Sequence, residues 1–112
     1  MGDEERFAQG LANLRDDDSF EALLAKAALP LMPEGSEDRH DLMMLWYVGE
    51  SLLALSTLEP FYAEHGLRIP DEVLVEMREF VESHKDSDVS AFRLSAWMCE
   101  RMLTHDAELA AT

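Results

Sequence analysis

Four histidines and one cysteine, set among 24 acidic residues, are the side chains of this 112-residue chain best suited to chemistry. Glu37 and His40 have the Glu-x-x-His spacing with which di-iron carboxylate proteins place two metal ligands on one side of a helix. Such a site needs a second copy of the motif and two further glutamates on facing helices. Because the chain has no second copy, we expect no di-iron centre.

The dipeptide His-Asp occurs twice, at His40–Asp41 and at His105–Asp106. Helical phosphohydrolases of the HD type bind a metal through such a dipeptide and an upstream histidine, but no histidine precedes His40. The chain also lacks the Gly-x-Ser-x-Gly, P-loop and dinucleotide-binding glycine motifs. We therefore expect no metal, no other cofactor and no enzymatic activity, and keep a small metal-dependent enzyme as the weakest hypothesis.

Cys99 and His84 are both expected to be structural. A single cysteine excludes an intramolecular disulfide bond and a multi-cysteine zinc site. The apolar neighbours of Cys99 indicate a buried thiol. His84 lies on the apolar arc of its helix, near the C-terminal end, which indicates a histidine at the edge of the core.

Helices must position all of these side chains, because the chain shows helical periodicities and no sustained period-two alternation. Pro30, Pro33 and Gly35 mark a loop, and Pro60 should end the helix that precedes it. The sequence therefore predicts an all-α fold, a bundle of about five helices in a single domain spanning residues 1–112. The expected helices cover about residues 3–15, 18–29, 37–59, 68–85 and 89–109, with a short helix or turn at 60–66.

The stretch from Leu42 to Leu58 is the most apolar part of the chain, yet it contains Glu50 near its centre. This acid and the acidic flanks argue against a membrane span. We therefore expect the helix over about 37–59 to be the central member of the bundle, surrounded by protein. By helical projection Glu50 shares a stripe with Trp46. The two form a buried polar site if the stripe faces the core, where the carboxylate needs a cation or a proton. In the alternative, Glu50 is paired or solvated at the edge of a groove.

A formal net charge of −15 disfavours binding to nucleic acid or anionic membranes and favours a basic partner. The simpler alternative is that the charge only keeps the protein in solution. On the helix within residues 68–85, four glutamates fall opposite the apolar arc. We expect them to form an exposed acidic stripe that is a candidate partner-binding surface: Glu72, Glu76, Glu79 and Glu82.

Trp97 departs from the pattern of the last predicted helix. The apolar arc of this helix comprises Ala91, Leu94, Met98, Met102 and Leu109, widened by Phe92, Cys99 and Leu103. Trp97 falls outside this arc, where a tryptophan either packs under a loop or binds a partner. We therefore predict a second partner-binding group on one helical face: Arg93, Trp97, Glu100 and Arg101. In an alternative, one of the two arginines turns inward and neutralises Glu50.

These patterns together favour a non-enzymatic, acidic protein-binding domain that engages a basic protein partner. One form of this hypothesis is an inhibitor that masks the nucleic-acid-binding surface of its partner. In size and charge alone, the chain is similar to small acidic helical immunity proteins that inhibit nuclease toxins, and to phage inhibitors that imitate DNA charge. The alternative is a structural or adaptor homodimer. With no secretory signal in residues 1–10 and one cysteine, we expect a cytoplasmic protein.

Overall fold

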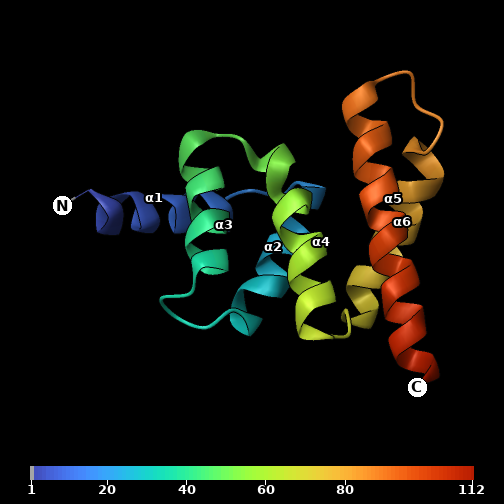
Figure 1. Cartoon of the computed structure of the whole chain (residues 1–112). Helices are drawn as coiled ribbons and strands as arrows, with labels where there is room; N and C mark the ends of the chain where they lie inside the picture. Colours follow the sequence, from blue (N-terminus) through green and yellow to red (C-terminus); the bar gives the residue numbers. More distant parts are fainter. Residues whose placement is uncertain (1) are drawn as a thin grey trace. The chain divides into compact units, whose positions relative to one another are not determined.

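The computed structural model describes residues 2–112, which form helices joined by short connections (Figure 1). Helices hold 79% of the chain, and no strand occurs within residues 2–112. The predicted all-α bundle is therefore confirmed, with six α-helices in this range. None of them is both long enough and apolar enough to cross a lipid bilayer. They are α1 (Asp3–Arg15), α2 (Phe20–Ala28), α3 (Glu37–Val48), α4 (Ala54–His65), α5 (Asp71–His84) and α6 (Ser90–Ala111).

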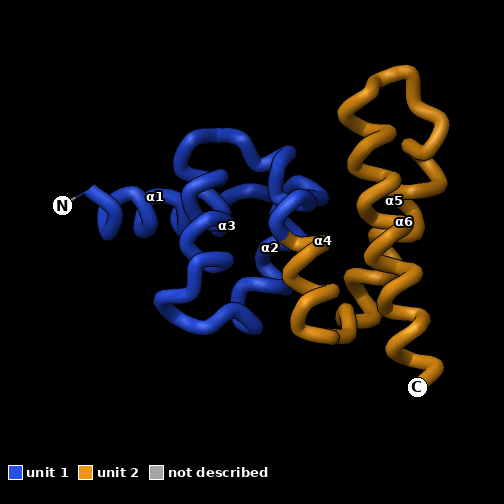
Figure 2. The backbone as a smooth tube through the Cα atoms, viewed as in Figure 1, with its two compact units in different colours: residues 1–57 blue, residues 58–112 orange. Residues whose placement is uncertain are grey.

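Two compact units make up the chain, residues 1–57 and residues 58–112 (Figure 2). The boundary falls within α4, so the first turn of this helix belongs to the first unit and the rest to the second. The single domain expected over residues 1–112 stays a prediction, because two compact units can unfold together or separately.

The close approach of α1 and α3 organises the first unit. Gly10 of α1 is buried there, and a Cβ atom at its position would overlap the backbone carbonyl oxygen of Met43. The same Cβ would lie 3.4 Å from the backbone nitrogen of Tyr47. Because the Met43 carbonyl is part of the backbone and cannot rotate away as a side chain can, only a glycine allows this spacing of the two helices.

Asp17 joins the end of α1 to α2 and α3. One carboxylate oxygen accepts a hydrogen bond from the Trp46 indole at 3.0 Å, and the other accepts one from the Ser19 amide at 2.8 Å. Lys26 donates to the Asp17 carbonyl at 2.7 Å. The backbone hydrogen bond from Ser19, aided by Trp46 and Lys26, lowers the pKa of Asp17. The buried Trp46 is thus bound by a carboxylate, but this carboxylate belongs to Asp17, which is far from Trp46 in the sequence, and not to Glu50.

The prediction of one continuous helix over residues 37–59 is wrong. α3 ends at Val48, and Gly49 follows in the left-handed conformation (φ 78°) that glycine adopts at helix ends. A short 3₁₀-helix (Ser51–Leu53) then leads into α4. Glu50 lies in this connection and is exposed. The apolar run continues across Gly49, so hydrophobicity alone did not reveal the break.

Pro60 also departs from its predicted role, because it lies inside α4 and does not end a helix. A proline nitrogen cannot donate to the carbonyl of Ser56 one turn earlier, so the helix continues without that hydrogen bond. α4 ends at His65, and Gly66 follows in the left-handed conformation (φ 58°) that glycine adopts at helix ends.

The pairing of α5 with α6 forms the body of the second unit. His84 stacks on Phe80 with ring centres 4.3 Å apart and meets Phe92 of α6 edge-on at 5.1 Å. Cys99 is fully buried on α6. The structure therefore confirms the histidine at the edge of the core and the buried thiol.

Candidate functional site

An open groove of about 440 Å³ lies between α4 and α6 within the second unit, and we call it the Trp97 groove. Two residues of α4 form one side and six residues of α6 form the other. The lining residues are Glu59 and Ala63 of α4, and Trp97, Glu100, Arg101, Thr104, His105 and Glu108 of α6.

Helical spacing brings the α6 residues to one face. Trp97, Arg101, Thr104 and Glu108 follow one another at intervals of four, three and four residues, the spacing of one side of a helix. On α4, Glu59 and Ala63 of the opposite side are four positions apart, which also places them on one face of their helix. The groove is thus formed by side chains from regular helices and not from loops.

The guanidinium of Arg101 lies between a carboxylate and an aromatic ring. Its Nε donates to Oε1 of Glu59 at 2.6 Å, and its central carbon lies 5.0 Å from the centre of the Trp97 ring. Trp97 itself is 51% exposed. The pair combines a charge-assisted hydrogen bond with a cation–π contact at a surface that water can reach.

A buried carboxylate next to the groove fixes the position of α6. Asp106 accepts hydrogen bonds from Nε and Nη2 of Arg68, at 2.9 and 3.2 Å, and from the Ile69 amide at 2.8 Å. The Arg68 guanidinium, together with the Ile69 amide, lowers the pKa of Asp106. Because Arg68 and Ile69 lie between α4 and α5, this cluster ties α6 to the end of α4.

The two side chains of the His105–Asp106 dipeptide have different surroundings. Asp106 is occupied by Arg68 and Ile69, whereas His105 lines the groove. The Nε2 atom of His105 is buried and has no hydrogen-bond partner within residues 2–112. In the same part of the chain, no three His, Cys, Asp or Glu side chains are grouped so that they could hold a metal ion.

Three of the four residues predicted around Trp97 lie together in the structure. Trp97, Glu100 and Arg101 line the groove, but Arg93 does not. Nη1 of Arg93 donates to the carbonyl of Ser87, just before α6 begins. The acid that Arg101 binds is Glu59 from α4, and not Glu50, which the sequence had suggested as a partner.

The predicted acidic stripe lies on the exposed side of α5. All four of its members, Glu72, Glu76, Glu79 and Glu82, are exposed. Glu82 forms an ion pair with Lys85 at 3.3 Å. None of the four lines the Trp97 groove, so the stripe is a separate acidic surface. Its role in partner binding stays a prediction.

The predicted buried polar site of Glu50 and Trp46 is wrong. Trp46 is 4% exposed and its indole binds Asp17. Glu50 is exposed beyond the end of α3, where water solvates its charge. The helix break at Gly49 removes Glu50 from the stripe that it would share with Trp46 in a continuous helix. The alternative of a solvated Glu50 is therefore what the structure shows.

Sequence reasoning missed three charged or titratable residues of the groove, Glu59, His105 and Glu108. Glu108 lies on the helical face of Trp97, so its spacing from Trp97 was a usable signal. Glu59 had no such signal, because it comes from another helix, 42 residues from Arg101 in the sequence. Contacts between helices are not encoded in the periodicity of either one.

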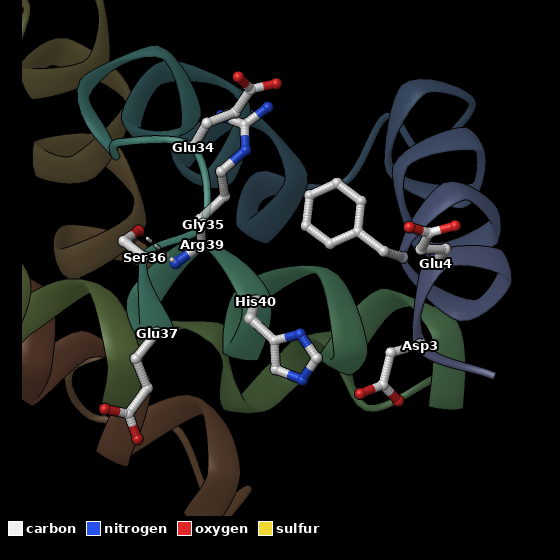
Figure 3. Close-up of a pocket in the computed structure, with 9 residues that line it drawn as sticks. Asp3, Glu4, Glu34, Gly35, Ser36, Glu37, Arg39 and His40 are labelled. Carbon is white, nitrogen blue, oxygen red and sulfur yellow. Dashed lines mark hydrogen bonds between the residues drawn. The ribbon is translucent and has the colours of Figure 1, made fainter. Parts of the chain in front are cut away.

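A second open cleft, of about 660 Å³, lies in the first unit between α1 and the start of α3 (Figure 3). The guanidinium carbon of Arg39 lies 5.8 Å from the centre of the Phe7 ring, and Nη1 of Arg39 donates to the Leu29 carbonyl at 3.0 Å. Phe7 is half-buried. Here the arginine also links α3 to the end of α2, so its contact with the ring serves the fold.

The Trp97 groove is a better candidate site than this cleft because the Trp97 ring is more exposed than the Phe7 ring. The remaining lining residues of the cleft are Asp3, Glu4, Glu34, Gly35, Ser36, Glu37 and His40.

No family model matches this chain, and no curated protein or solved structure is significantly similar to it. The functional argument therefore rests on the geometry of the groove and on the charge of the chain.

Proposed function

We propose that this protein is a non-enzymatic, acidic protein-binding domain that engages a basic protein partner through the Trp97 groove. The observation that carries the proposal is the half-exposed ring of Trp97, which lines the groove beside Arg101 and three carboxylates. Tryptophan is enriched among the residues that dominate binding energy at protein interfaces. A tryptophan that packed under a loop would be buried, so its exposure favours binding over packing.

The charge of the second unit fits a basic partner. Residues 58–112 contain 12 acidic and 5 basic residues, which gives a formal charge of −7. Within the groove, Glu59, Glu100 and Glu108 outnumber the single Arg101. A concave surface of one sign attracts and orients a partner of the opposite sign. The exposed stripe on α5 adds to the same negative field.

A partner that binds nucleic acid would make the protein an inhibitor of the immunity type. The carboxylates of the groove would then compete with phosphates for the lysines and arginines of the partner. Such a complex loses affinity steeply as salt is added, because the attraction acts between charges. The single buried thiol of Cys99 fits the proposed cytoplasmic location of this protein.

The test begins with basic peptides selected on the wild-type protein from a displayed library. Their affinities are then measured calorimetrically for Trp97→Ala and for Leu52→Ala. Leu52 is a matched control, since it is a large apolar residue of the first unit with 53% exposure. We expect Trp97→Ala to lose about 2 kcal/mol of binding or more, with little change in melting temperature.

Leu52→Ala should change neither the affinity for the peptides nor the melting temperature. If Trp97→Ala bound the peptides as tightly as the wild type, the proposed function would be refuted. A large loss of melting temperature with unchanged binding would instead make Trp97 a core residue, for which truncation costs about 3–5 kcal/mol.

One observation favours the alternative of an adaptor homodimer. Four large apolar residues at the connection between α3 and α4 are exposed by 41–57%: Tyr47, Val48, Leu52 and Leu53. Exposed apolar patches mark interfaces, whereas a charge of −15 on each copy opposes self-association. Sedimentation velocity of the purified protein distinguishes the two functions, because only the homodimer doubles its mass without a partner.

A further inference from the structure

We infer that the Trp97 groove recognises an arginine side chain of the partner, and that Arg101 occupies the place of that arginine in the free protein. The inference rests on the proposed function and names the group that the partner supplies. The groove already holds a guanidinium, bound by Glu59 and covered by the ring of Trp97. A carboxylate acceptor and an aromatic face are the features with which proteins bind arginine.

Arg101 is held loosely enough to be replaced. Its side chain is 55% exposed, and within residues 2–112 its only hydrogen bond runs from Nε to Glu59. Arg68 of the same unit shows the contrast, because two of its nitrogens bind the buried carboxylate of Asp106. An exposed ion pair with a single hydrogen bond contributes little to stability. Arg101 can therefore leave the groove while α6 stays folded.

The groove also has the charge to receive a second guanidinium. Glu100 and Glu108 line it, and within residues 2–112 neither forms an ion pair or a side-chain hydrogen bond. An arginine that enters from a partner thus meets Glu59 together with two further carboxylates. The displaced Arg101 is mostly solvated already, so its release exposes little new charge.

Arginine fits this arrangement better than lysine. The planar guanidinium can donate to the Glu59 carboxylate and make a cation–π contact with the Trp97 ring at the same time, as Arg101 does. A lysine ammonium is compact and more strongly hydrated, so it gains less from the aromatic face. The groove should therefore discriminate between two residues of equal charge.

Two arginines of α6 provide a matched pair of variants. Arg101→Ala removes the guanidinium from the groove, and Arg93→Ala removes the same charge from the same helix outside the groove. The probes are N-acetyl-arginine amide and N-acetyl-lysine amide, titrated into the full chain. The indole N–H signal of Trp97 is followed by NMR, and circular dichroism verifies that both variants are folded.

We expect Arg101→Ala to bind the arginine probe about tenfold more tightly than the wild type. In the wild type, Arg101 should leave the groove free for about a tenth of the time, so the apparent affinity of the wild type for the arginine probe is about tenfold lower. Arg93→Ala should bind it like the wild type, and the lysine probe should bind every variant more weakly. The inference is overturned if Arg101→Ala binds no more tightly than Arg93→Ala, or if lysine binds as well as arginine.

The selected basic peptides separate this inference from the proposed function. Suppose that Trp97→Ala abolishes peptide binding, but replacing every peptide arginine by lysine changes nothing. Recognition of arginine is then wrong, while the protein-binding function stands. If Trp97→Ala binds the peptides normally, the proposed function fails whatever the amide probes show.

Discussion

Removal of the Asp106 carboxylate should destabilise the second unit far more than removal of an exposed acid from the same helix. In Asp106→Ala, the Ile69 amide and the Arg68 guanidinium lose their common acceptor. A hydrogen bond to a charged group contributes about 1.5–3 kcal/mol, and a buried N–H without a partner costs about 1–3 kcal/mol. Because the Asp106 side chain is only 6% exposed, water cannot replace it easily. Because Arg68 is 52% exposed, water replaces part of its lost contact, and we expect a total loss of about 2–3 kcal/mol.

Urea denaturation followed by circular dichroism measures this loss, and Glu108→Ala is the matched control. Glu108 carries the same charge two residues away and is exposed, so its removal should change stability by less than about 0.5 kcal/mol. Hydrogen exchange of the Ile69 amide gives a local measurement, and it should accelerate in Asp106→Ala alone. Equal denaturation midpoints for the two variants would refute the reasoning.

The same carboxylate makes stability depend on pH. The Arg68 guanidinium lowers the pKa of Asp106 in the folded protein, so the unfolded chain takes up the proton first as the pH falls. The stabilisation is therefore complete above the pKa of the unfolded chain, about 3.9. It is lost as the pH falls through the lower pKa of the folded protein. As the pH falls, the free energy of unfolding should consequently decrease more for the wild type than for Asp106→Ala. Equal decreases would show that Asp106 is not the source of this pH dependence.

Two further predictions concern the close approach of α1 and α3 and the acidic stripe. Gly10→Ala should destabilise the first unit by about 1–3 kcal/mol in urea denaturation, because its Cβ would overlap the Met43 carbonyl; the helix propensity of alanine offsets this by about 1 kcal/mol at most. Unchanged stability would show that the two helices do not meet at Gly10. Glu76→Gln combined with Glu79→Gln should leave the fold intact, as measured by circular dichroism. The double variant should bind the basic peptides more weakly than the wild type, and its binding should depend less steeply on salt. An unchanged salt slope would leave the stripe with a role in solubility alone.

Helical periodicity was sufficient to predict the fold class and the exposed face of α5, because both depend on residues within one helix. The break after α3 shows where this reasoning ends. Gly49 is compatible with a helix interior, at a cost of about 1 kcal/mol, and with a left-handed helix end. The apolar residues on both sides of Gly49 favoured a helix interior there, but the structure shows a left-handed helix end.

The buried side of α6 was predicted only in part, for a different reason. Leu94 was placed on the apolar arc but is 53% exposed, whereas Ser95 and Asp106 lie outside that arc and are buried. Asp106 is buried because it binds Arg68, 38 residues away in the sequence. A hydrophobicity pattern counts every acid as exposed, so it cannot find a carboxylate that a distant arginine holds inside. For the same reason, Glu59 could not be assigned to the groove from the sequence.

The measurement that tests the central claim most directly is the NMR footprint of a bound basic peptide on the 112-residue chain. The Trp97 indole and the backbone amides along the groove are compared with and without the peptide. We expect the largest shifts at Trp97, Arg101 and Glu59, with much smaller changes in the first unit. Shifts confined to α5, or to the exposed apolar residues between α3 and α4, would contradict the assignment of the Trp97 groove as the binding site.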